Sequence, residues 1–247
     1  MKKYKYLFFT SLVVIVILVL LVLVNRMMWI SEKEKTYDFG QLARYEADNN
    51  ALSGKPVSVV FLGNSITDFW VDKHPEFFSD NGYVDRGISG QTTSQMLVRF
   101  REDVLNLNPE ILVILAGIND IAENTGPYTE AYTFGNIKTM AELAQAKGIR
   151  VILCSVLPCN FFFWNPDITD MVPKIVSLNA KIKSYAETQD IPYVNYYDSM
   201  VYGDDFALNP DYTSDGCHPT LEGYLVMEPL VKAEIDSVRT MACSLQQ

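Results

Sequence analysis

The stretch "VVFLGNSITDFW", residues 59–70, opens as an apolar, β-branched run and breaks off at Gly63-Asn64-Ser65. The run is typical of a buried strand, and the apolar residues that resume after Ser65 are typical of a helix. A serine in such a strand-to-helix turn has two interpretations. It can cap the helix, or it can be a nucleophile held at the end of a sheet, which requires a base, an acid and oxyanion donors elsewhere in the chain.

Strand-like and helix-like segments alternate along the rest of the chain. Apolar runs stand at residues 57–62, 83–88, 111–116, 151–156 and 191–197. Helical patterns stand between and after them, at residues 92–104, 128–147, 172–187 and 219–241. Thr92 and Gln95 form a capping box at the start of the first pattern. The alternation predicts an α/β fold, a three-layer α/β/α sandwich around a parallel sheet of about five strands.

The first thirty residues have a different character. The apolar run from Leu7 to Val24 would span about 27 Å as a helix, close to the thickness of the hydrocarbon core of a bilayer. Residues 22–31 offer no small-residue cleavage site, so we expect an uncleaved transmembrane signal anchor over residues 1–30. Secretion after cleavage is the alternative.

The orientation of this segment rests on a slight charge bias. Basic residues flank it on both sides, namely Lys2, Lys3 and Lys5 before it and Arg26, Lys33 and Lys35 after it. The very short N-terminal tail favours an N-terminus on the inside, which places the large domain outside the cytoplasm, in the periplasm or at the cell surface. We expect residues 31–54 to be a charged, partly helical connector and residues 55–242 to form one domain.

Charge and cysteine content exclude several classes of function. The net charge of −10 argues against a nucleic-acid partner, which usually demands a basic face. The four cysteines are irregularly spaced and form no CxxC pair, so neither a disulfide framework nor a zinc site is expected: Cys154, Cys159, Cys217 and Cys243. A location outside the cytoplasm would allow a Cys154–Cys159 bridge without requiring one.

Residues suited to acyl transfer follow several of the predicted strands. Because the carboxyl ends of parallel strands share one edge of a sheet, Ser65 and the later segments should meet there. His218 can take the proton of Ser65, and Asp215, three residues earlier, can hold the imidazole in the required tautomer. Pro219 as the first residue of the last helix would make His218 its cap. The backbone N–H groups of Ser65 and Gly90 and the side-chain amide of Asn119 are candidate oxyanion donors.

With these residues in this order, the chain resembles the SGNH (GDSL-type) hydrolases. Four stretches resemble the signature blocks of that family, over about residues 57–235: "FLGNSITDFW", "RGISGQTT", "LAGINDIAEN" and "DGCHP". The resemblance implies a flavodoxin-like sandwich and ester hydrolysis without metal or cofactor. It also implies a Ser65–His218–Asp215 triad, with Gly90 and Asn119 completing the oxyanion hole. One departure is Asn64, where the family usually has Asp; the amide keeps the hydrogen-bonding shape and loses the charge.

An aromatic run follows the fourth predicted strand. Phe162, Phe163 and Trp164, with Asn64, are candidate substrate-binding residues, since aromatic rings stack on sugars or line acyl pockets. Packing of this loop onto the core is the alternative. We expect a serine esterase that removes short acyl groups, above all acetyl, from carbohydrate. The alternatives are a lysophospholipase or thioesterase, a glycan O-acyltransferase with the same triad, and a non-catalytic glycan binder at the cell surface.

Overall fold

The computed structural model describes the backbone of residues 2–244 and the side chains of residues 12–29 and 37–241. The chain divides into two compact units, Met1–Leu42 and Ala43–Gln247. Predictions that concern six side chains lie outside the described residues: Lys2, Lys3, Lys5, Lys33, Lys35 and Cys243.

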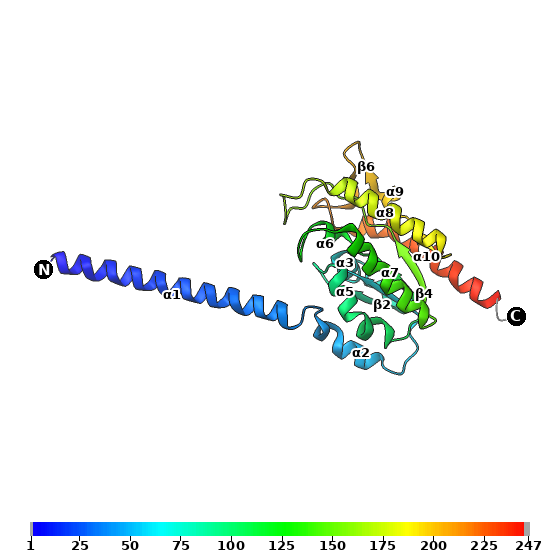
Figure 1. Cartoon of the computed structure of the whole chain (residues 1–247), viewed down its shortest axis with the longest axis horizontal. Coiled ribbons are helices and arrows are strands. Elements are labelled where there is room, and N and C mark those ends of the chain that lie inside the picture. Colours follow the sequence, from blue (N-terminus) through cyan, green and yellow to red (C-terminus); the bar gives the residue numbers. More distant parts are fainter. Residues whose placement is uncertain (1, 245–247) are drawn as a thin grey trace. The chain divides into compact units, whose positions relative to one another are not determined.

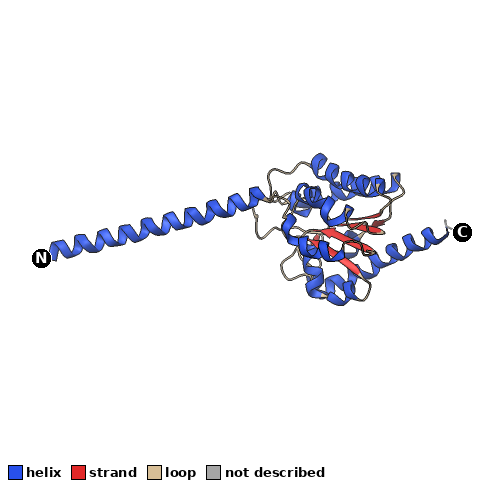
Figure 2. Ribbon diagram, turned by 90° about the horizontal axis from the view of Figure 1, so that it is seen from below, coloured by secondary structure: helices blue, strands red, loops and turns tan. Residues whose placement is uncertain are grey.

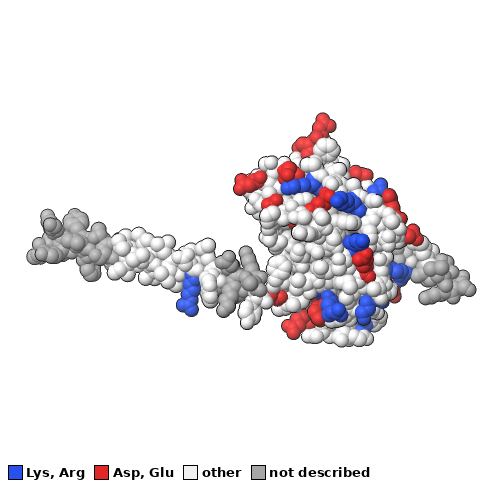
Figure 3. Space-filling view, in the orientation of Figure 1, with Lys and Arg blue, Asp and Glu red and all other residues white. Residues whose placement is uncertain are grey.

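The first unit is dominated by one long helix, α1 (Lys2–Tyr37) (Figure 1). Its segment Leu12–Trp29 has a mean hydropathy of 2.7 and is long and apolar enough to cross a membrane. A signal sequence near an N-terminus would meet the same criteria. The space-filling view shows little charge along the described part of this helix (Figure 3).

In the second unit, strands and helices alternate as the sequence predicts. The strands of the main sheet are β1 (Val59–Gly63), β2 (Tyr83–Gly87), β3 (Ile111–Ile114), β4 (Arg150–Cys154) and β5 (Tyr193–Val194). The longer helices are α3 (Ser65–Lys73), α5 (Thr93–Phe100), α7 (Glu130–Ala146), α8 (Met171–Thr188) and α10 (Leu221–Ser244). Short elements complete the unit: η1 (Leu42–Tyr45), α2 (Glu46–Leu52), α4 (Pro75–Ser79), the π-helical turn η2 (Arg101–Leu105), α6 (Ile118–Ile121), α9 (Tyr196–Met200), the hairpin of β6 (Val201–Tyr202) and β7 (Ala207–Leu208), and η3 (Pro210–Tyr212).

The five strands pair in the order β2-β1-β3-β4-β5, and every pairing is parallel. Val59 in β1 lies opposite Tyr83 on one side and Ile111 on the other, which fixes the register of the sheet at its centre. This is the flavodoxin-like strand order, in which ligands bind beyond the carboxyl ends of the strands. The predicted α/β/α sandwich is therefore confirmed.

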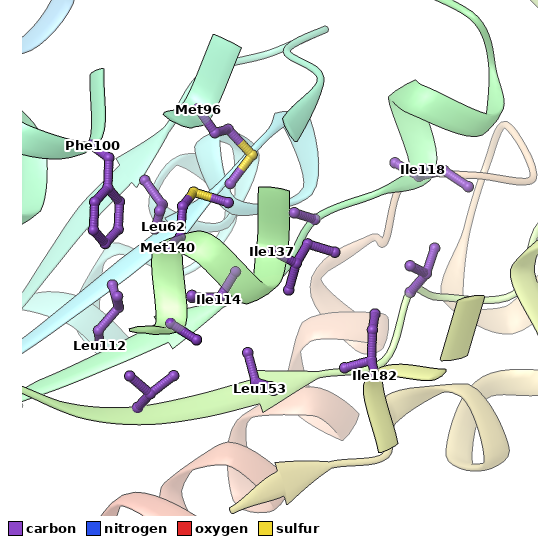
Figure 4. Close-up of a cluster of buried hydrophobic side chains, with 14 of the residues drawn as sticks. Leu62, Met96, Phe100, Leu112, Ile114, Ile118, Ile137, Met140, Leu153 and Ile182 are labelled. Atoms are coloured by element: carbon purple, nitrogen blue, oxygen red, sulfur yellow. The ribbon is translucent and has the colours of Figure 1, made fainter. Parts of the chain in front are cut away.

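Each face of the sheet is covered by its own layer of helices (Figure 2). Successive residues of β1 alternate between the two cores, Val60 and Leu62 on one face and Val59 and Phe61 on the other, as a period of two requires. The first core packs against α5, α7 and α8, and ten of its residues are labelled in Figure 4: Leu62, Met96, Phe100, Leu112, Ile114, Ile118, Ile137, Met140, Leu153 and Ile182. The second core is rich in aromatic rings and packs against α3, α4, α9 and α10.

Two predicted boundaries near the site are wrong. The fifth strand ends at Val194 because the Asn195 side chain caps α9, accepting a hydrogen bond from the backbone N–H of Asp198 at 3.2 Å. Helix α10 begins at Leu221, not at Pro219, so His218 is not its cap residue. The carbonyl of Thr220 accepts the N–H of Tyr224 instead, at 3.0 Å.

The allowed Cys154–Cys159 bridge does not form. Both residues and Cys217 carry free, buried thiols. Cys154 packs in the aromatic core and Cys159 in the core on the opposite face of the sheet, which separates their side chains.

Candidate active site

Ser65 is the first residue of α3, two positions beyond the end of β1. The preceding residue, Asn64, caps the helix, and its side-chain oxygen accepts the N–H of Ile66 at 3.4 Å. Asn64 is almost fully buried, so its amide has a local structural contact. The substitution of Asp by Asn thus keeps the cap that the turn uses.

His218 brings a second segment, far away in sequence, to Ser65. Its Nε2 lies 2.9 Å from the Oγ of Ser65, and its Nδ1 lies 2.7 Å from Oδ2 of Asp215. The other carboxylate oxygen of Asp215 accepts the backbone N–H groups of Cys217 and His218 at 2.9 and 2.8 Å. The Thr213 hydroxyl donates to the carbonyl of His218 at 2.8 Å. These bonds hold His218 in place without a helix cap.

The same contacts set the charge of Asp215. Burial alone would raise its pKa, but the N–H groups of His218 and Cys217 and the His218 ring outweigh burial and lower it. The carboxylate therefore remains ionised near neutral pH. An ionised acceptor at Nδ1 favours the tautomer that leaves Nε2 free to accept a proton.

The second and third predicted blocks lie at the same edge of the sheet. Gly90 is exposed in the loop after β2 and has a φ of +78°, a conformation that favours glycine. Asn119 lies in α6, after β3, and is buried. One of its amide hydrogens is donated to the carbonyl of Gln91 at 3.0 Å, which leaves the second free for another acceptor.

Two glycines let α3 lie directly on the sheet. A Cβ on Gly63 would overlap the side chain of Thr67, and a Cβ on Gly87 would overlap the backbone nitrogen of Asp68. The start of α3 thus meets strand backbone directly at Gly87, and at Gly63 the Thr67 side chain fills the space that a Cβ would need. The position of Ser65 follows directly from the ends of β1 and β2.

Two carboxylates, Asp68 and Asp120, fix the loop between β2 and α5 by hydrogen bonds. Asp68, in the first turn of α3, accepts the N–H and the hydroxyl of Ser89 at 3.1 and 2.6 Å. Asp120 accepts the N–H and the hydroxyl of Thr93 at 2.9 and 2.6 Å, which caps α5 from the next block. Burial raises the pKa of Asp120, against the effect of these hydrogen bonds. The loop that carries Gly90 is therefore held at both ends.

The aromatic loop after β4 lies beside the imidazole. The ring centroids of Trp164 and Phe163 lie 6.1 and 6.4 Å from that of His218, and Phe69 of α3 lies 5.2 Å from it. Phe163 is 54 % exposed, so its ring is open to a ligand. Phe162, by contrast, is fully buried in the core. Phe162 thus packs in the core, as the alternative interpretation of the loop expects, while Phe163 and Trp164 lie beside His218.

Asn124 joins the aromatic loop to the Gly90 loop. Its amide donates to the carbonyl of Gly90 at 2.9 Å, and its side-chain oxygen accepts the indole N–H of Trp164 at 3.0 Å. Asn165 adds a second link, donating to the carbonyl of Ala122 at 2.9 Å. The aromatic loop and the Gly90 loop are therefore joined by side-chain hydrogen bonds.

The second histidine has a different environment. His74 Nδ1 lies 2.7 Å from Glu228, whose carboxylate also accepts the indole N–H of Trp70 at 3.1 Å. This pair joins α10 to the end of α3 and has no contact with Ser65 among the described hydrogen bonds. Among the described residues, no group of three or more His, Cys, Asp or Glu side chains is arranged to hold a metal ion.

Sequence reasoning missed four residues that brace the site: Asp68, Gln91, Arg99 and Asn124. Arg99 had a visible signal, since it stands beside Met96 and Phe100 on the apolar side of α5, where a charge needs a buried partner. Asp68 and Asn124 are polar residues in polar surroundings, and their bonds depend on the tertiary fold.

The comparisons with known proteins agree with this geometry. The model of the GDSL-like lipase/acylhydrolase family matches residues 61–226. A crystal structure of a GDSL-like lipase from Bacteroides thetaiotaomicron is 57 % identical, with a TM-score of 0.79, and the match covers 81 % of this chain and 98 % of that one. An acetylxylan esterase from Geobacillus stearothermophilus shares the fold at 18 % identity and a TM-score of 0.59, over 74 % of this chain and 95 % of its own. Among curated proteins, none matches the chain.

Family, fold and the arrangement of polar groups at the sheet edge lead to the same conclusion. The matched region holds all four signature blocks, from the strand before Ser65 to the helix after His218. The chain belongs to the GDSL-like lipase/acylhydrolase family and is a carboxylic ester hydrolase.

Proposed function

We propose that Ser65, His218 and Asp215 form the catalytic triad of this hydrolase. The observation that carries the proposal is the continuous chain of contacts from Ser65 Oγ to His218 Nε2, at 2.9 Å, and from His218 Nδ1 to Asp215 Oδ2, at 2.7 Å. A serine hydroxyl is a weak nucleophile until a neighbouring base accepts its proton. His218 is in position for that step before substrate binds.

In the proposed reaction, Ser65 Oγ attacks the ester carbonyl while His218 Nε2 takes its proton. The negative charge that develops on the carbonyl oxygen would be stabilised by the N–H groups of Ser65 and Gly90 and by the second amide hydrogen of Asn119. His218 then gives the proton to the departing alcohol, which breaks the ester bond and leaves an acyl group on Ser65. Water, deprotonated by His218, hydrolyses this acyl-enzyme and restores the serine.

We propose short acyl esters, above all acetyl, on carbohydrate as the substrate class. Aromatic rings beside His218 suit this class, because the flat face of a sugar ring stacks well on an aromatic side chain. Trp164 is held in place by Asn124, and Phe163 is exposed next to it. A fixed ring and an open ring beside the base are the features that a bound sugar would use.

A lysophospholipase or thioesterase is the second candidate, and the apolar segment Leu12–Trp29 is the observation that favours it. An anchored enzyme meets lipid substrates at the membrane surface. The two candidates differ in the acyl chain that they accept. A sugar deacetylase should prefer chains of two to four carbons, whereas a lipid enzyme should prefer about eight or more.

We further propose that α1 remains as a single membrane-spanning anchor and that the second unit lies outside the cytoplasm. The length and hydropathy of Leu12–Trp29 support the anchor. Protease treatment of intact cells should degrade the second unit if it lies at the cell surface, and treatment of spheroplasts should do so if it is periplasmic. Full protection in both would contradict the proposed topology, and a mature chain that begins after Trp29 would contradict the anchor.

The decisive test uses the full chain in detergent and a series of p-nitrophenyl esters. Ser65→Ala should abolish both the turnover of p-nitrophenyl acetate and labelling by a fluorophosphonate. Ser79→Ala, an exposed serine of α4, is the matched control and should keep both. Persistent turnover in Ser65→Ala would overturn the proposed triad. A preference for long acyl chains, with the triad intact, would overturn only the substrate.

A further inference from the structure

Arg99 is fully buried in α5, although its side chain carries a charge. Each nitrogen of its guanidinium meets a different acceptor. Nε donates to the side-chain oxygen of Gln91 at 2.6 Å, Nη2 to the carbonyl of Gly63 at 2.9 Å, and Nη1 to Asp103 at 2.9 Å. A rigid planar group with three occupied donors fixes the relative positions of its three acceptors.

One of the three acceptors, Gly63, belongs to the turn that carries Ser65. Gly63 is the last residue of β1, two positions before Ser65. Its carbonyl also accepts the N–H of Ile88, at 3.3 Å, and so lies between the end of the sheet and Arg99. Because a glycine is free to adopt many backbone conformations, an anchored carbonyl restricts the turn that aims Ser65.

Another acceptor, Gln91, belongs to the proposed oxyanion loop. Gln91 follows Gly90, and its side chain is buried. Its backbone carbonyl accepts the amide of Asn119 at 3.0 Å, so a single residue joins Arg99 to the third block. Asn119 has one hydrogen on Gln91 and one left for substrate, so a shift of Gln91 would turn the remaining hydrogen away from the reacting oxygen.

The third acceptor balances the charge. Asp103 lies on the π-helical turn after α5, four residues beyond Arg99, and is buried with it. Its second oxygen accepts the amide of Asn49 in α2 at 2.7 Å, which extends the network to that helix. The positive charge is therefore neutralised by a residue outside the proposed catalytic machinery.

We infer that Arg99 is a positioning residue of the esterase reaction, which holds the turn before Ser65 and the Gln91–Asn119 link in one fixed geometry. It touches neither substrate nor reacting atoms. It acts because the attacking oxygen and the oxyanion donors come from different segments of the chain, and small relative displacements of such groups reduce the rate strongly. The inference rests on the proposed roles of Ser65 and Asn119.

The test separates this role from a purely structural one. Arg99→Lys keeps a positive charge for Asp103, but an ammonium on a flexible stem does not reproduce the fork that reaches Gln91 and Gly63 together. We expect kcat for p-nitrophenyl acetate to fall about 10- to 100-fold with KM changed less than about threefold. The matched control is Arg150→Lys, since Arg150 is half-buried at the start of β4 and donates to the carbonyl of Val238 in α10 at 2.8 Å, with no contact to Gln91, Gly63 or Asp103 among the described hydrogen bonds. It should lower the melting temperature and leave kcat within about twofold of wild type.

A second variant guards against misfolding. Gln91→Met leaves the Arg99–Asp103 pair intact and removes the side-chain oxygen that accepts from Arg99 Nε, so it should also lower kcat in a folded protein. A double-mutant cycle then measures coupling, because Arg99→Lys should cost much less in an Asn119→Ala background if it acts through Asn119.

Four outcomes are informative. A kcat for Arg99→Lys within twofold of wild type would overturn the positioning role. Losses from Arg99→Lys and Asn119→Ala that simply multiply in the double mutant would overturn it too. In both cases Ser65→Ala would remain inactive, so the proposed triad would stand. Equal kcat losses in Arg99→Lys and Arg150→Lys would also overturn it, because the effect would then follow the loss of any arginine contact in the domain. Full turnover in Ser65→Ala would instead refute the proposed triad, on which the inference depends.

Discussion

Asp68 accepts two hydrogen bonds from Ser89, one from its backbone N–H and one from its hydroxyl, at 3.1 and 2.6 Å. Asp68 lies one turn after Ser65 and Ser89 lies one residue before Gly90, so this contact joins the proposed nucleophile helix to the proposed oxyanion loop. Charge-assisted hydrogen bonds of this kind are stronger than neutral ones.

The first prediction concerns this contact. Asp68→Ala should lower kcat for p-nitrophenyl acetate about tenfold, because the Gly90 loop loses the contact that ties it to α3. The free energy of unfolding should fall by about 1–3 kcal/mol. Asp72→Ala, an exposed acid on the next turn of α3, should change neither quantity appreciably. Unchanged kcat in Asp68→Ala would show that the loop keeps its geometry without the contact.

The second prediction concerns the tautomer of His218. In Asp215→Asn the side-chain oxygen can still accept the N–H groups of Cys217 and His218, so the loop should keep its shape. The new amide would face Nδ1 as a donor and would favour a proton on Nε2, the wrong nitrogen for accepting from Ser65. We expect kcat to fall about 10³- to 10⁴-fold. Asp211→Asn in the same loop is the control, and steady-state kinetics of the two variants would decide.

The third prediction concerns stability and pH. Burial raises the pKa of Asp85 from 3.8 to about 7, against the hydrogen bonds that it accepts from Gly87 and Tyr45. Between about pH 4 and 7 the folded protein therefore keeps a proton that the unfolded chain releases. The Asp85 contribution to the free energy of unfolding should be full below about pH 4 and disappear as the pH rises through about 7.

Urea titrations at a series of pH values, followed by tryptophan fluorescence, would measure this effect. The difference in unfolding free energy between wild type and Asp85→Asn should change across the window, with wild type losing stability relative to the variant as the pH rises. The exposed Asp80→Asn should run parallel to wild type. A constant difference between wild type and Asp85→Asn would show that the folded carboxyl ionises at its ordinary pKa.

The fourth prediction concerns Trp164 of the aromatic loop. Trp164→Ala should raise KM for an acetylated oligosaccharide about three- to tenfold, the equivalent of one lost aromatic contact, and should affect p-nitrophenyl acetate less. Trp164→Phe keeps a ring but loses the bond to Asn124, so its KM for the oligosaccharide should lie between those of wild type and Trp164→Ala. Equal effects on both substrates would point to a role of Trp164 in supporting His218 and not in recognising sugar.

The sheet and the positions of the four blocks could be predicted because both depend on local pattern. Apolar runs mark the strands, and polar residues after their carboxyl ends must share one edge of a parallel sheet. The details of the fourth block could not be predicted. Pro219 is a good first helical residue, yet the network of Thr213 and Asp215 fixes His218 before the helix starts.

The aromatic loop shows the same limit. Four consecutive aromatic residues carry no pattern that tells which ring faces inward. Tertiary packing buries Phe162 and leaves Phe161 and Phe163 exposed on either side of it. Arg99 is the opposite case, since a charged residue beside apolar neighbours in a helix shows from the sequence that some buried acceptor must exist, although not which one.

The close approach of α3 to two glycines has a consequence for how this enzyme can change. The helix meets strand backbone at Gly87 and fills the space beside Gly63 with its own Thr67 side chain, so a Cβ at either position would overlap α3. Substitutions in core positions that do not touch α3 can alter stability while the serine stays where it is. Neither glycine tolerates even a methyl group, and a directed-evolution library should recover variation in those core positions but none at these two sites.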